Sequence, residues 1–313
     1  MNFSWIKPEN PISFPKLGLN LGDIPLGFAI GDVSIRFYGV IIAIGLMLAV
    51  IYGLRRSKQF GLKEDDILDG VFFIVPLAII CARLYYCAFQ WEDYKNEPLS
   101  ILYIWQGGLA IYGGVIGAAI GVVAFSFIKK VKLGAVLDLV GISFLIGQSI
   151  GRWGNFMNRE AFGAVTDSFL GMEITSDLNG IRATYHPTFL YESLWNAVGF
   201  VLLHFLSKKR RYDGQMALGY AAWYGLGRTF IESLRMDSLM WGNFRVSQLL
   251  AAATCFLAAT ALVLMTFRKH DPEKLFVNVV ARREALAIPE NEEISEPEET
   301  EAETEETATE IDN

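Results

Sequence analysis

Seven long apolar segments dominate this sequence of 313 residues. They fall at about 35–54, 67–89, 108–128, 135–155, 189–207, 215–234 and 246–267. Each is long enough to cross a bilayer as an α-helix, because a span needs roughly 20 mostly apolar residues. Hydrophobic residues make up 52% of the chain, more than a soluble domain of this length usually contains. The sequence therefore predicts an all-α polytopic membrane protein with about seven transmembrane helices.

Four basic clusters set the predicted orientation of these helices. They follow the first, third, fifth and seventh apolar segments, and they are Arg55–Lys58, Lys129–Lys132, Lys208–Arg211 and Arg268–His270. In a seven-helix chain all four lie on the same side of the membrane, and the positive-inside rule makes that side the cytoplasm. We therefore expect the N-terminus outside and the C-terminus inside. The longer connections at 1–34 and 156–188 then form an outer-face loop region.

The regions outside the apolar segments divide the chain into three parts. We expect an external N-terminal segment at 1–34, a seven-helix transmembrane domain at 35–267 and a cytoplasmic tail at 268–313. No cleavable signal peptide is expected, because the first thirty residues lack a basic segment followed by an apolar core.

The end of the tail has a composition typical of disorder. Thirteen acidic residues and no basic residue lie between Glu284 and Asn313. Such a segment cannot bury enough apolar surface to fold, so we expect an acidic, disordered tail from about residue 284. The formal charge of −7 originates in this tail, since the first 283 residues carry a net charge of +6.

Cysteines are too sparse to indicate a metal centre or a disulfide framework. Cys81, Cys87 and Cys255 lie inside apolar segments, and no C-x-x-C pair occurs. The stretch Gly147–Gly151 matches the serine-hydrolase pattern G-x-S-x-G. That pattern acts at a strand-to-helix turn, whereas this stretch lies inside a predicted helix, so hydrolase chemistry is not supported.

Glycines recur at helical spacing in the third and fourth apolar segments. They are Gly113, Gly117, Gly121, Gly147 and Gly151. Glycines four residues apart let helix backbones approach closely in lipid, where hydrophobicity cannot drive association. We therefore expect tight helix packing here, with close approach to a ligand an equal alternative at Gly113.

Polar side chains gather at one depth of the predicted bundle. Charges inside membrane spans are costly and are often functional. Five helices contribute polar groups near their outer ends, namely Arg36, Tyr38, Arg83, Tyr86, Tyr112, Arg152, Asn155, Arg228 and Glu232. The pattern predicts a polar chamber in the outer leaflet.

Structural alternatives stay open for some of these residues. Arg36 could extend to the membrane edge, and Arg228 and Glu232, four residues apart, could form a structural ion pair. Arg152 has no acidic residue within its own helical turn, which favours an anionic ligand. Because a planar guanidinium suits phosphate, two arginines in a lipid environment indicate a phospholipid head group.

The stretch Gly151–Gly163, GRWGNFMNREAFG, resembles the signature of the prolipoprotein diacylglyceryl transferases. Supporting segments are IRFYG (35–39), ARLYY (82–86), WQGGLAIYGGVIG (105–117), HPTFLYE (186–192) and YGLGRTFIE (224–232). The resemblance covers nearly all of residues 30–267, and the order and spacing of the segments agree.

The resemblance implies a multi-pass enzyme of the bacterial cytoplasmic (plasma) membrane. Such enzymes transfer the diacylglyceryl group of phosphatidylglycerol to the thiol of the lipobox cysteine in preprolipoprotein signal peptides. A thioether forms and glycerol phosphate is released, as the first step of lipoprotein maturation. The implied partners are these two substrates and membrane lipids, without nucleic acid, and no metal or other cofactor is implied.

The same resemblance implies roles for individual residues. Arg152 and Arg228 would bind the phosphate, and the catalytic set would comprise Tyr38, Tyr112, Asn155, Glu160 and Glu232. Asn155 and Glu160 would fix the head group, while Glu232 would orient Arg228 or assist proton transfer.

The general base remains open between two residues. Some relatives carry histidine at the position of Tyr112, and a phenol is a poor base near neutral pH because its unperturbed pKa is about 10. Either Tyr112 hydrogen-bonds the substrate, or the proton is removed elsewhere, with His186 and Glu232 as the candidates.

A phospholipid or anion transporter with an outward-facing arginine-lined cavity is the competing hypothesis. A transporter would favour polar groups near the midplane and at both ends, often with paired repeats. The polar set here lies on one side, and the sequence shows no internal repeat.

Overall fold

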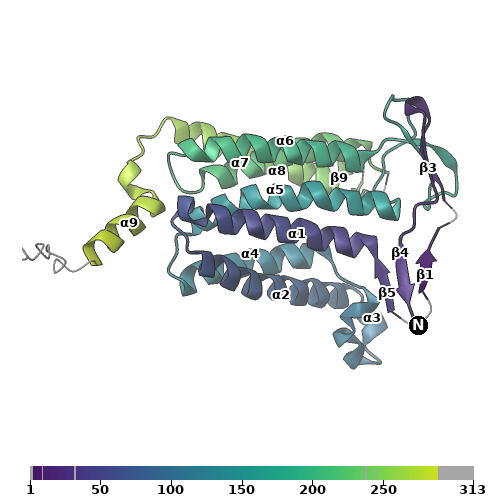
Figure 1. Ribbon diagram of the computed structural model, residues 1–313, viewed down its shortest axis with the longest axis horizontal. Helices are drawn as coiled ribbons and strands as arrows, with labels where there is room; N and C mark the ends of the chain where they lie inside the picture. The colour runs from purple at the N-terminus through teal and green to yellow at the C-terminus, as the bar shows by residue number, and fades with distance from the viewer. Residues whose placement is uncertain (1–2, 9, 32, 237, 243, 288–313) are drawn as a thin grey trace, which may run out of the picture.

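The computed structural model describes residues 3–8, 10–31, 33–236, 238–242 and 244–287. Within them, seven long helices run roughly parallel to the longest axis of the molecule (Figure 1). They are α1 (Phe37–Arg56), α2 (Glu64–Phe89), α4 (Ile111–Ile128), α5 (Leu133–Asn158), α6 (Thr188–Leu206), α7 (Gln215–Leu234) and α8 (Val246–Thr266). Every boundary lies close to that of a predicted segment, so the helices themselves are confirmed.

Six of these helices are long and apolar enough to cross a membrane, judged by length and composition over the described residues. The exception is α7, which has 20 residues but carries polar side chains and packs against α5, α6 and α8. The all-α polytopic membrane class is therefore confirmed. Seven crossings and the orientation of the bundle stay predictions.

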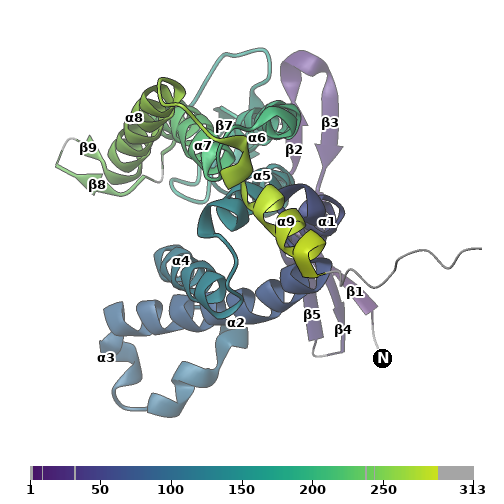
Figure 2. The ribbon, with the colours of Figure 1, turned by 90° about the vertical axis from the view of Figure 1, so that its left-hand side faces the viewer.

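Helix α5 lies at the centre of the bundle. It packs against α1, α6 and α7, whereas α4 packs mainly on α2 and α8 packs on α7 (Figure 2). Ile142 and Leu145 of α5 are fully buried, and Leu139 is nearly so. The central position of α5 places the side chains of its last two turns between several neighbouring helices.

Two helix pairs approach closely because glycine removes the side chain at the contact. A Cβ atom added to Gly117 of α4 would lie 2.6 Å from the Cβ atom of Cys81 on α2. A Cβ atom added to Gly45 of α1 would lie 3.2 Å from the carbonyl oxygen of Gly147 on α5. The predicted role of Gly117 and Gly147 in tight packing is confirmed, and Gly45 adds a contact of the same kind.

Shorter elements occupy the connections between the long helices. The additional α-helices are α3 (Trp91–Tyr94) and α9 (Phe276–Ala287). The 3-10 helices are η1 (Pro15–Leu17), η2 (Ser57–Phe60), η3 (Pro98–Leu102), η4 (Ile104–Gln106), η5 (Ser207–Lys209) and η6 (Pro272–Lys274). The strands are β1 (Phe3–Ile6), β2 (Ile12–Phe14), β3 (Leu19–Gly22), β4 (Gly27–Ile30), β5 (Val33–Arg36), β6 (Met172–Thr175), β7 (Arg182–Tyr185), β8 (Met240–Trp241) and β9 (Phe244–Arg245).

The strands join the two long connections that the sequence places on the outer face. Strands β3, β2, β6 and β7 form one antiparallel sheet in that order, so residues from 1–34 pair with residues from 156–188. Strands β1, β4 and β5 form a second sheet, and β5 leads directly into α1. Both sheets lie at one end of the helical bundle, which we call the sheet end (Figure 1).

The opposite end carries the connections that contain the four basic clusters, together with α9 (Figure 1). Helix α9 begins at Phe276, whose side chain is buried and whose backbone N–H donates to Asp213 over 2.8 Å. It continues to Ala287, three residues past the expected start of disorder. The rest of the expected acidic tail, 288–313, lies outside the described residues.

A buried arginine fastens the N-terminal strands to the end of α5. Arg159 follows α5 in the left-handed conformation, with φ of 57° and an exposure of 2%. Its guanidinium donates to the carbonyl oxygens of Asn10, Ile24 and Met157 over 2.8–2.9 Å. Two positions of the N-terminal segment and the end of α5 therefore meet on one side chain.

We expect Arg159→Ala to destabilise the sheet end, because three buried carbonyl oxygens lose a charged donor worth about 1.5–3 kcal/mol each. The midpoint of thermal unfolding in detergent should fall by at least about 5 °C. Arg182→Ala is the control, because this more exposed side chain also reaches the N-terminal segment, where it donates to the carbonyl oxygen of Pro11. Its removal should change the free energy of unfolding by at most about 0.5 kcal/mol. Equal midpoints for the two variants would contradict the structural role of Arg159.

The orientation can be tested with single cysteines in a background that lacks the three native ones. Asn96, after α3, and Asn179, between β6 and β7, are both exposed, and cysteines in their place should react with a membrane-impermeant thiol reagent in intact cells. One replacing Lys209, exposed at the opposite end, should react only after permeabilisation. Reaction at Lys209 alone in intact cells would reverse the orientation.

Candidate active site

Three helices bring two arginines and two glutamates together near the sheet end. Arg152 lies near the end of α5, Glu192 in the first turns of α6, and Arg228 and Glu232 in the last turns of α7. The Glu192 carboxylate forms ion pairs with both guanidiniums: its Oε1 lies 2.7 Å from Arg152 Nη2, and its Oε2 accepts a hydrogen bond of 3.0 Å from Arg228 Nη1. Arg228 Nη2 also lies 2.5 Å from Glu232 Oε2. We call these four residues the arginine–glutamate cluster.

A hydrogen-bonded chain connects the cluster to the surface. Arg152 Nη1 donates to Asn155 Oδ1 over 3.0 Å, and Asn155 Nδ2 donates to Glu160 Oε1 over 2.8 Å. The left-handed turn at Arg159 folds the chain back, so the backbone N–H of Glu160 also meets the carbonyl oxygen of Asn155. Glu160 is exposed, and the chain therefore leads from the buried guanidiniums to the outside of the bundle.

The carboxylates of the cluster are more buried than its guanidiniums. The side chains of Glu192 and Glu232 are 3% and 2% exposed, against 22% for Arg152 and 16% for Arg228. Glu232 also accepts a hydrogen bond of 2.8 Å from Ser238. A guanidinium has five N–H donors and these contacts use only some of them, so both arginines keep donors for an anionic ligand.

The expectation that Arg152 lacks an acidic partner is wrong, because Glu192 reaches it from a different helix. The ion pair between Arg228 and Glu232, which the sequence left open, is confirmed. These pairs hold the guanidiniums in fixed positions, which is compatible with either a structural or a ligand-binding role.

Glu192 is the residue that sequence reasoning missed. It is the only acidic residue in the predicted segment 189–207, and it ends the HPTFLYE stretch. A charged residue inside a membrane span is costly and often functional, and this general expectation already applies to Glu192 in the sequence. Its two arginine partners lie on other helices, so no spacing within one helix points to this pairing.

Arg83 does not belong to the cluster, which corrects its expected place in the polar chamber. Its side chain donates to the carbonyl oxygens of Ser100, Ile101, Gly107 and Gly108, over 2.7–3.1 Å. Arg83 therefore holds the connection between α2 and α4 in place. Its donors are satisfied by the backbone of that connection.

The two predicted tyrosines lie in different surroundings. Tyr38, in the first turn of α1, packs on α5, where a Cβ atom added to Gly154 would lie 2.8 Å from its ring. Glu160 and Arg152 are close enough to influence the Tyr38 hydroxyl electrostatically. Tyr112 begins α4 and is 41% exposed, and no hydrogen bond joins it to the cluster within the described residues. Catalytic roles for both tyrosines stay predictions.

The two candidate bases also differ in their contacts. His186 Nδ1 lies 3.2 Å from the Tyr191 hydroxyl, and burial lowers the pKa of His186, so its imidazole is neutral at neutral pH. Glu232 is held by Arg228 and Ser238. His186 thus has a neutral ring in contact with Tyr191, whereas Glu232 is paired with Arg228, and the identity of the base stays a prediction.

We expect Glu192→Gln to destabilise the bundle, because it leaves two guanidiniums facing an uncharged amide. Removing one partner of a buried ion pair typically costs about 3–5 kcal/mol. Thermal unfolding in detergent measures the effect. The matched control is Glu64→Gln, which removes a carboxylate that pairs with Lys58 at an exposed site and should shift stability by less than about 1 kcal/mol. Wild-type stability of Glu192→Gln would show that the cluster is not held by this carboxylate.

The sequence is similar to known proteins over the region that contains the cluster. A family model described as "Prolipoprotein diacylglyceryl transferase" matches residues 25–265. A relative from Listeria monocytogenes serotype 4a (strain HCC23) is 41% identical over 268 residues, which are 83% of this chain and 97% of the relative. A relative from Enterococcus faecalis (strain ATCC 700802 / V583) is 44% identical over 262 residues, 81% of this chain and 93% of the relative.

Both relatives are named phosphatidylglycerol–prolipoprotein diacylglyceryl transferase. The matched region contains the whole of α1–α7, most of α8, and every residue of the arginine–glutamate cluster. The resemblance noted in the sequence is thereby confirmed, and this multi-pass membrane protein belongs to the prolipoprotein diacylglyceryl transferase family.

Proposed function

We propose that this protein transfers the diacylglyceryl group of phosphatidylglycerol to the thiol of the lipobox cysteine of a preprolipoprotein, in the bacterial plasma membrane. The observation that carries the proposal is the pair of guanidiniums of Arg152 and Arg228, held by one carboxylate in a member of this family. Residues 35–267 would form the catalytic domain.

The reaction places new charge on the phosphate. A carbon–sulfur bond forms at the glyceryl carbon, and the bond between that carbon and the phosphate oxygen breaks. The phosphodiester carries one negative charge, the glycerol phosphate that leaves carries two, and the thiol loses its proton. Stabilisation of the leaving phosphate therefore lowers the barrier directly.

The cluster suits this charge development because its donors are already oriented. Glu192 fixes both guanidiniums from one side, and Glu232 fixes Arg228 from another, so neither arginine must reorganise as charge appears. Fixed donors in a site shielded from water act more strongly than mobile ones in water. In this proposal Arg152 and Arg228 bind the phosphate, and the two glutamates position them.

The acceptor thiol benefits from the same positive groups. The thiolate is the nucleophile, and cationic surroundings favour ionisation of a cysteine that is mostly protonated at neutral pH. The hydrogen-bonded chain from Arg152 through Asn155 to Glu160 leads outward, which suits contacts with the head group. Tyr38, packed beside this chain, would line the same space.

The proposal is tested by incubating purified protein with phosphatidylglycerol and a lipobox peptide, followed by mass analysis of the peptide. A mass increase equal to one diacylglyceryl group is expected. A peptide with serine in place of the cysteine should stay unmodified. Folded protein that leaves the cysteine peptide unchanged would contradict the proposed function, and movement of lipid without a peptide adduct would favour a transporter.

Arg152 provides the sharpest test of phosphate binding. Arg152→Ala should lower turnover per folded molecule by roughly 10²–10³, the scale for removal of a preorganised donor. Arg152→Lys keeps the charge but loses the planar fork, so it should also lose much of the activity. The control is Arg211→Ala, an exposed arginine at the end of the bundle opposite the sheets, which should turn over normally. Normal turnover by Arg152→Ala would exclude the phosphate-binding role.

A further inference from the structure

Two tryptophans join α6 to α7 through a reciprocal contact. The indole N–H of Trp195 on α6 donates to the backbone carbonyl oxygen of Trp223 on α7 over 2.9 Å, and the indole N–H of Trp223 donates to the carbonyl oxygen of Trp195 over 2.9 Å. The two rings stack, with their centroids 4.3 Å apart and an angle of 16° between their planes. A carbonyl oxygen has two lone pairs, so each can accept an indole N–H besides its partner within the helix. We call these two residues the tryptophan pair.

Glycines on both helices make room for the tryptophan pair. Gly199 lies one turn after Trp195, and a Cβ atom added to it would lie 2.2 Å from Nε1 of Trp223. Gly227 lies one turn after Trp223, and a Cβ atom added to it would lie 2.2 Å from Nε1 of Trp195. A shift of one residue along either helix moves the contact by about 1.5 Å and turns it by about 100°. The pair therefore fits one rotation and one register of α6 against α7.

The tryptophan pair lies next to the ion pair that joins the same two helices. Trp195 follows Glu192 by three residues, which is about 4.5 Å along α6, and Gly227 immediately precedes Arg228. Over the residues that the structure describes, the side-chain hydrogen bonds between α6 and α7 are the two indole contacts and the bond of 3.0 Å from Arg228 to Glu192. The register that the pair imposes is thus the register in which Glu192 meets Arg228.

The two contacts differ in how strictly they define this register. Glutamate and arginine side chains are long and flexible, so an ion pair between them survives small shifts of the helix backbones. An indole ring turns about only two side-chain torsions, so its hydrogen bond to a backbone carbonyl oxygen tolerates little movement. Apolar helix surfaces gain nothing by associating in lipid, which leaves close packing and polar contacts to align the helices.

We propose that the tryptophan pair positions the arginine–glutamate cluster for the transfer reaction. By holding α6 and α7 in one register, the pair places Arg228 against Glu192, and Glu192 in turn holds Arg152. This inference rests on the proposed function and adds two positioning residues to it, which act through the arginines and not on the reacting atoms. A displacement of about 1 Å can cost about a hundredfold in rate, so a relaxed register should lower turnover even where the fold survives.

Loss of either indole N–H should therefore lower kcat. Trp195→Phe and Trp223→Phe each remove one donor and part of the stack, and each should lower kcat per folded molecule about tenfold, with KM for the lipobox peptide within about twofold of wild type. The double variant should lose about as much as each single variant, because breaking either contact releases the same register. A loss of about a hundredfold in the double variant would contradict this shared role.

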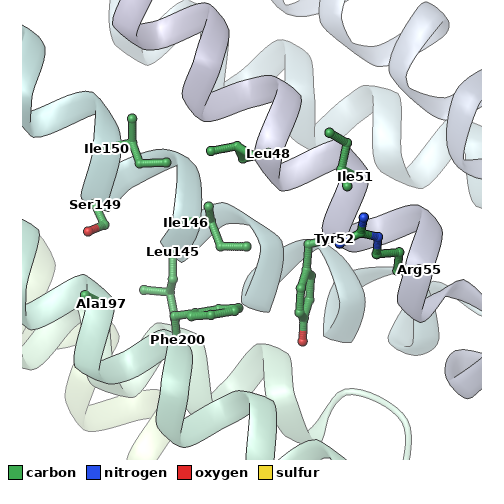
Figure 3. A pocket seen from close by; sticks show the side chains of 10 residues that line it. All are labelled: Leu48, Ile51, Tyr52, Arg55, Leu145, Ile146, Ser149, Ile150, Ala197 and Phe200. Carbon is green, nitrogen blue, oxygen red and sulfur yellow. The ribbon is translucent and has the colours of Figure 1, made fainter.

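Tyr52→Phe is the matched control, because Tyr52 on α1 also joins α6 by a ring contact and a hydrogen bond. Its ring lies 5.1 Å from that of Phe200 (Figure 3), and its hydroxyl lies 3.0 Å from His204 Nδ1. His204 follows Glu192 by twelve residues, about 18 Å along α6. Tyr52→Phe should lower the midpoint of thermal unfolding but keep kcat within about twofold of wild type. Equal kcat values in the control and the tryptophan variants would overturn the proposal.

A spectroscopic measurement tests the positioning without relying on turnover. In protein labelled isotopically at arginine, the magnetic-resonance signals of Arg228 are assigned by their absence from Arg228→Lys. A guanidinium held by two carboxylates rotates slowly, so Arg228 should give separate Nη signals in the wild-type protein. These signals should average in Trp195→Phe, where the register is relaxed, and stay separate in Tyr52→Phe.

An isosteric variant separates positioning from damage to the fold. Benzothienylalanine in place of Trp195 keeps the shape of the ring and replaces only the N–H group, by sulfur. It should fold like the wild-type protein and show the kcat and the averaged Arg228 signals of Trp195→Phe. Wild-type kcat and separate signals in this variant would contradict the proposal. Absence of transfer by the wild-type protein would contradict the proposed function, whereas normal transfer by every tryptophan variant would contradict only this inference.

Discussion

The Glu192 carboxylate determines the arrangement on which the rest of the proposed site depends. Two positive guanidiniums from α5 and α7 cannot lie close together in a bilayer without a shared counter-charge, because their repulsion is strong where water is scarce. Glu192 supplies that charge from α6, with one oxygen directed to each arginine. The same carboxylate therefore joins three helices and fixes the positions of the two arginines that are proposed to bind phosphate.

Four arginines of the described bundle fall into two groups by the chemistry of their partners. Arg83 and Arg159 donate to backbone carbonyl oxygens, which fixes the connections they contact. Arg152 and Arg228 instead face carboxylates and keep some donors available. The residue type is the same in both groups, so the partners and the exposure distinguish a structural arginine from a candidate for ligand binding.

The position of the cluster along the helices connects it with the lipid substrate. It lies near the sheet end, where α5 and α7 end and α6 begins. In the predicted orientation this end of the bundle faces the outer leaflet, where a phospholipid presents its phosphate. The sheets built from 1–34 and 156–188 are fastened by Arg159 beside Glu160, so the outer connections also hold the exposed part of the site.

The sequence by itself determined the helices, the glycine contacts and the local part of the site. Apolar segments of fixed length define helices regardless of their neighbours, and Arg152, Asn155 and Glu160 meet because they lie within nine residues of chain. The tertiary structure decided the partner of Arg152 and the role of Arg83. An ion pair between α5 and α6 depends on how the helices are rotated and packed, which the periodicity of the sequence does not determine. The hydrogen bonds of the Arg83 guanidinium to backbone carbonyl oxygens likewise cannot be predicted from composition. Side chains on different helices pair only where the packed helices bring them into contact, and that packing is a property of the tertiary structure.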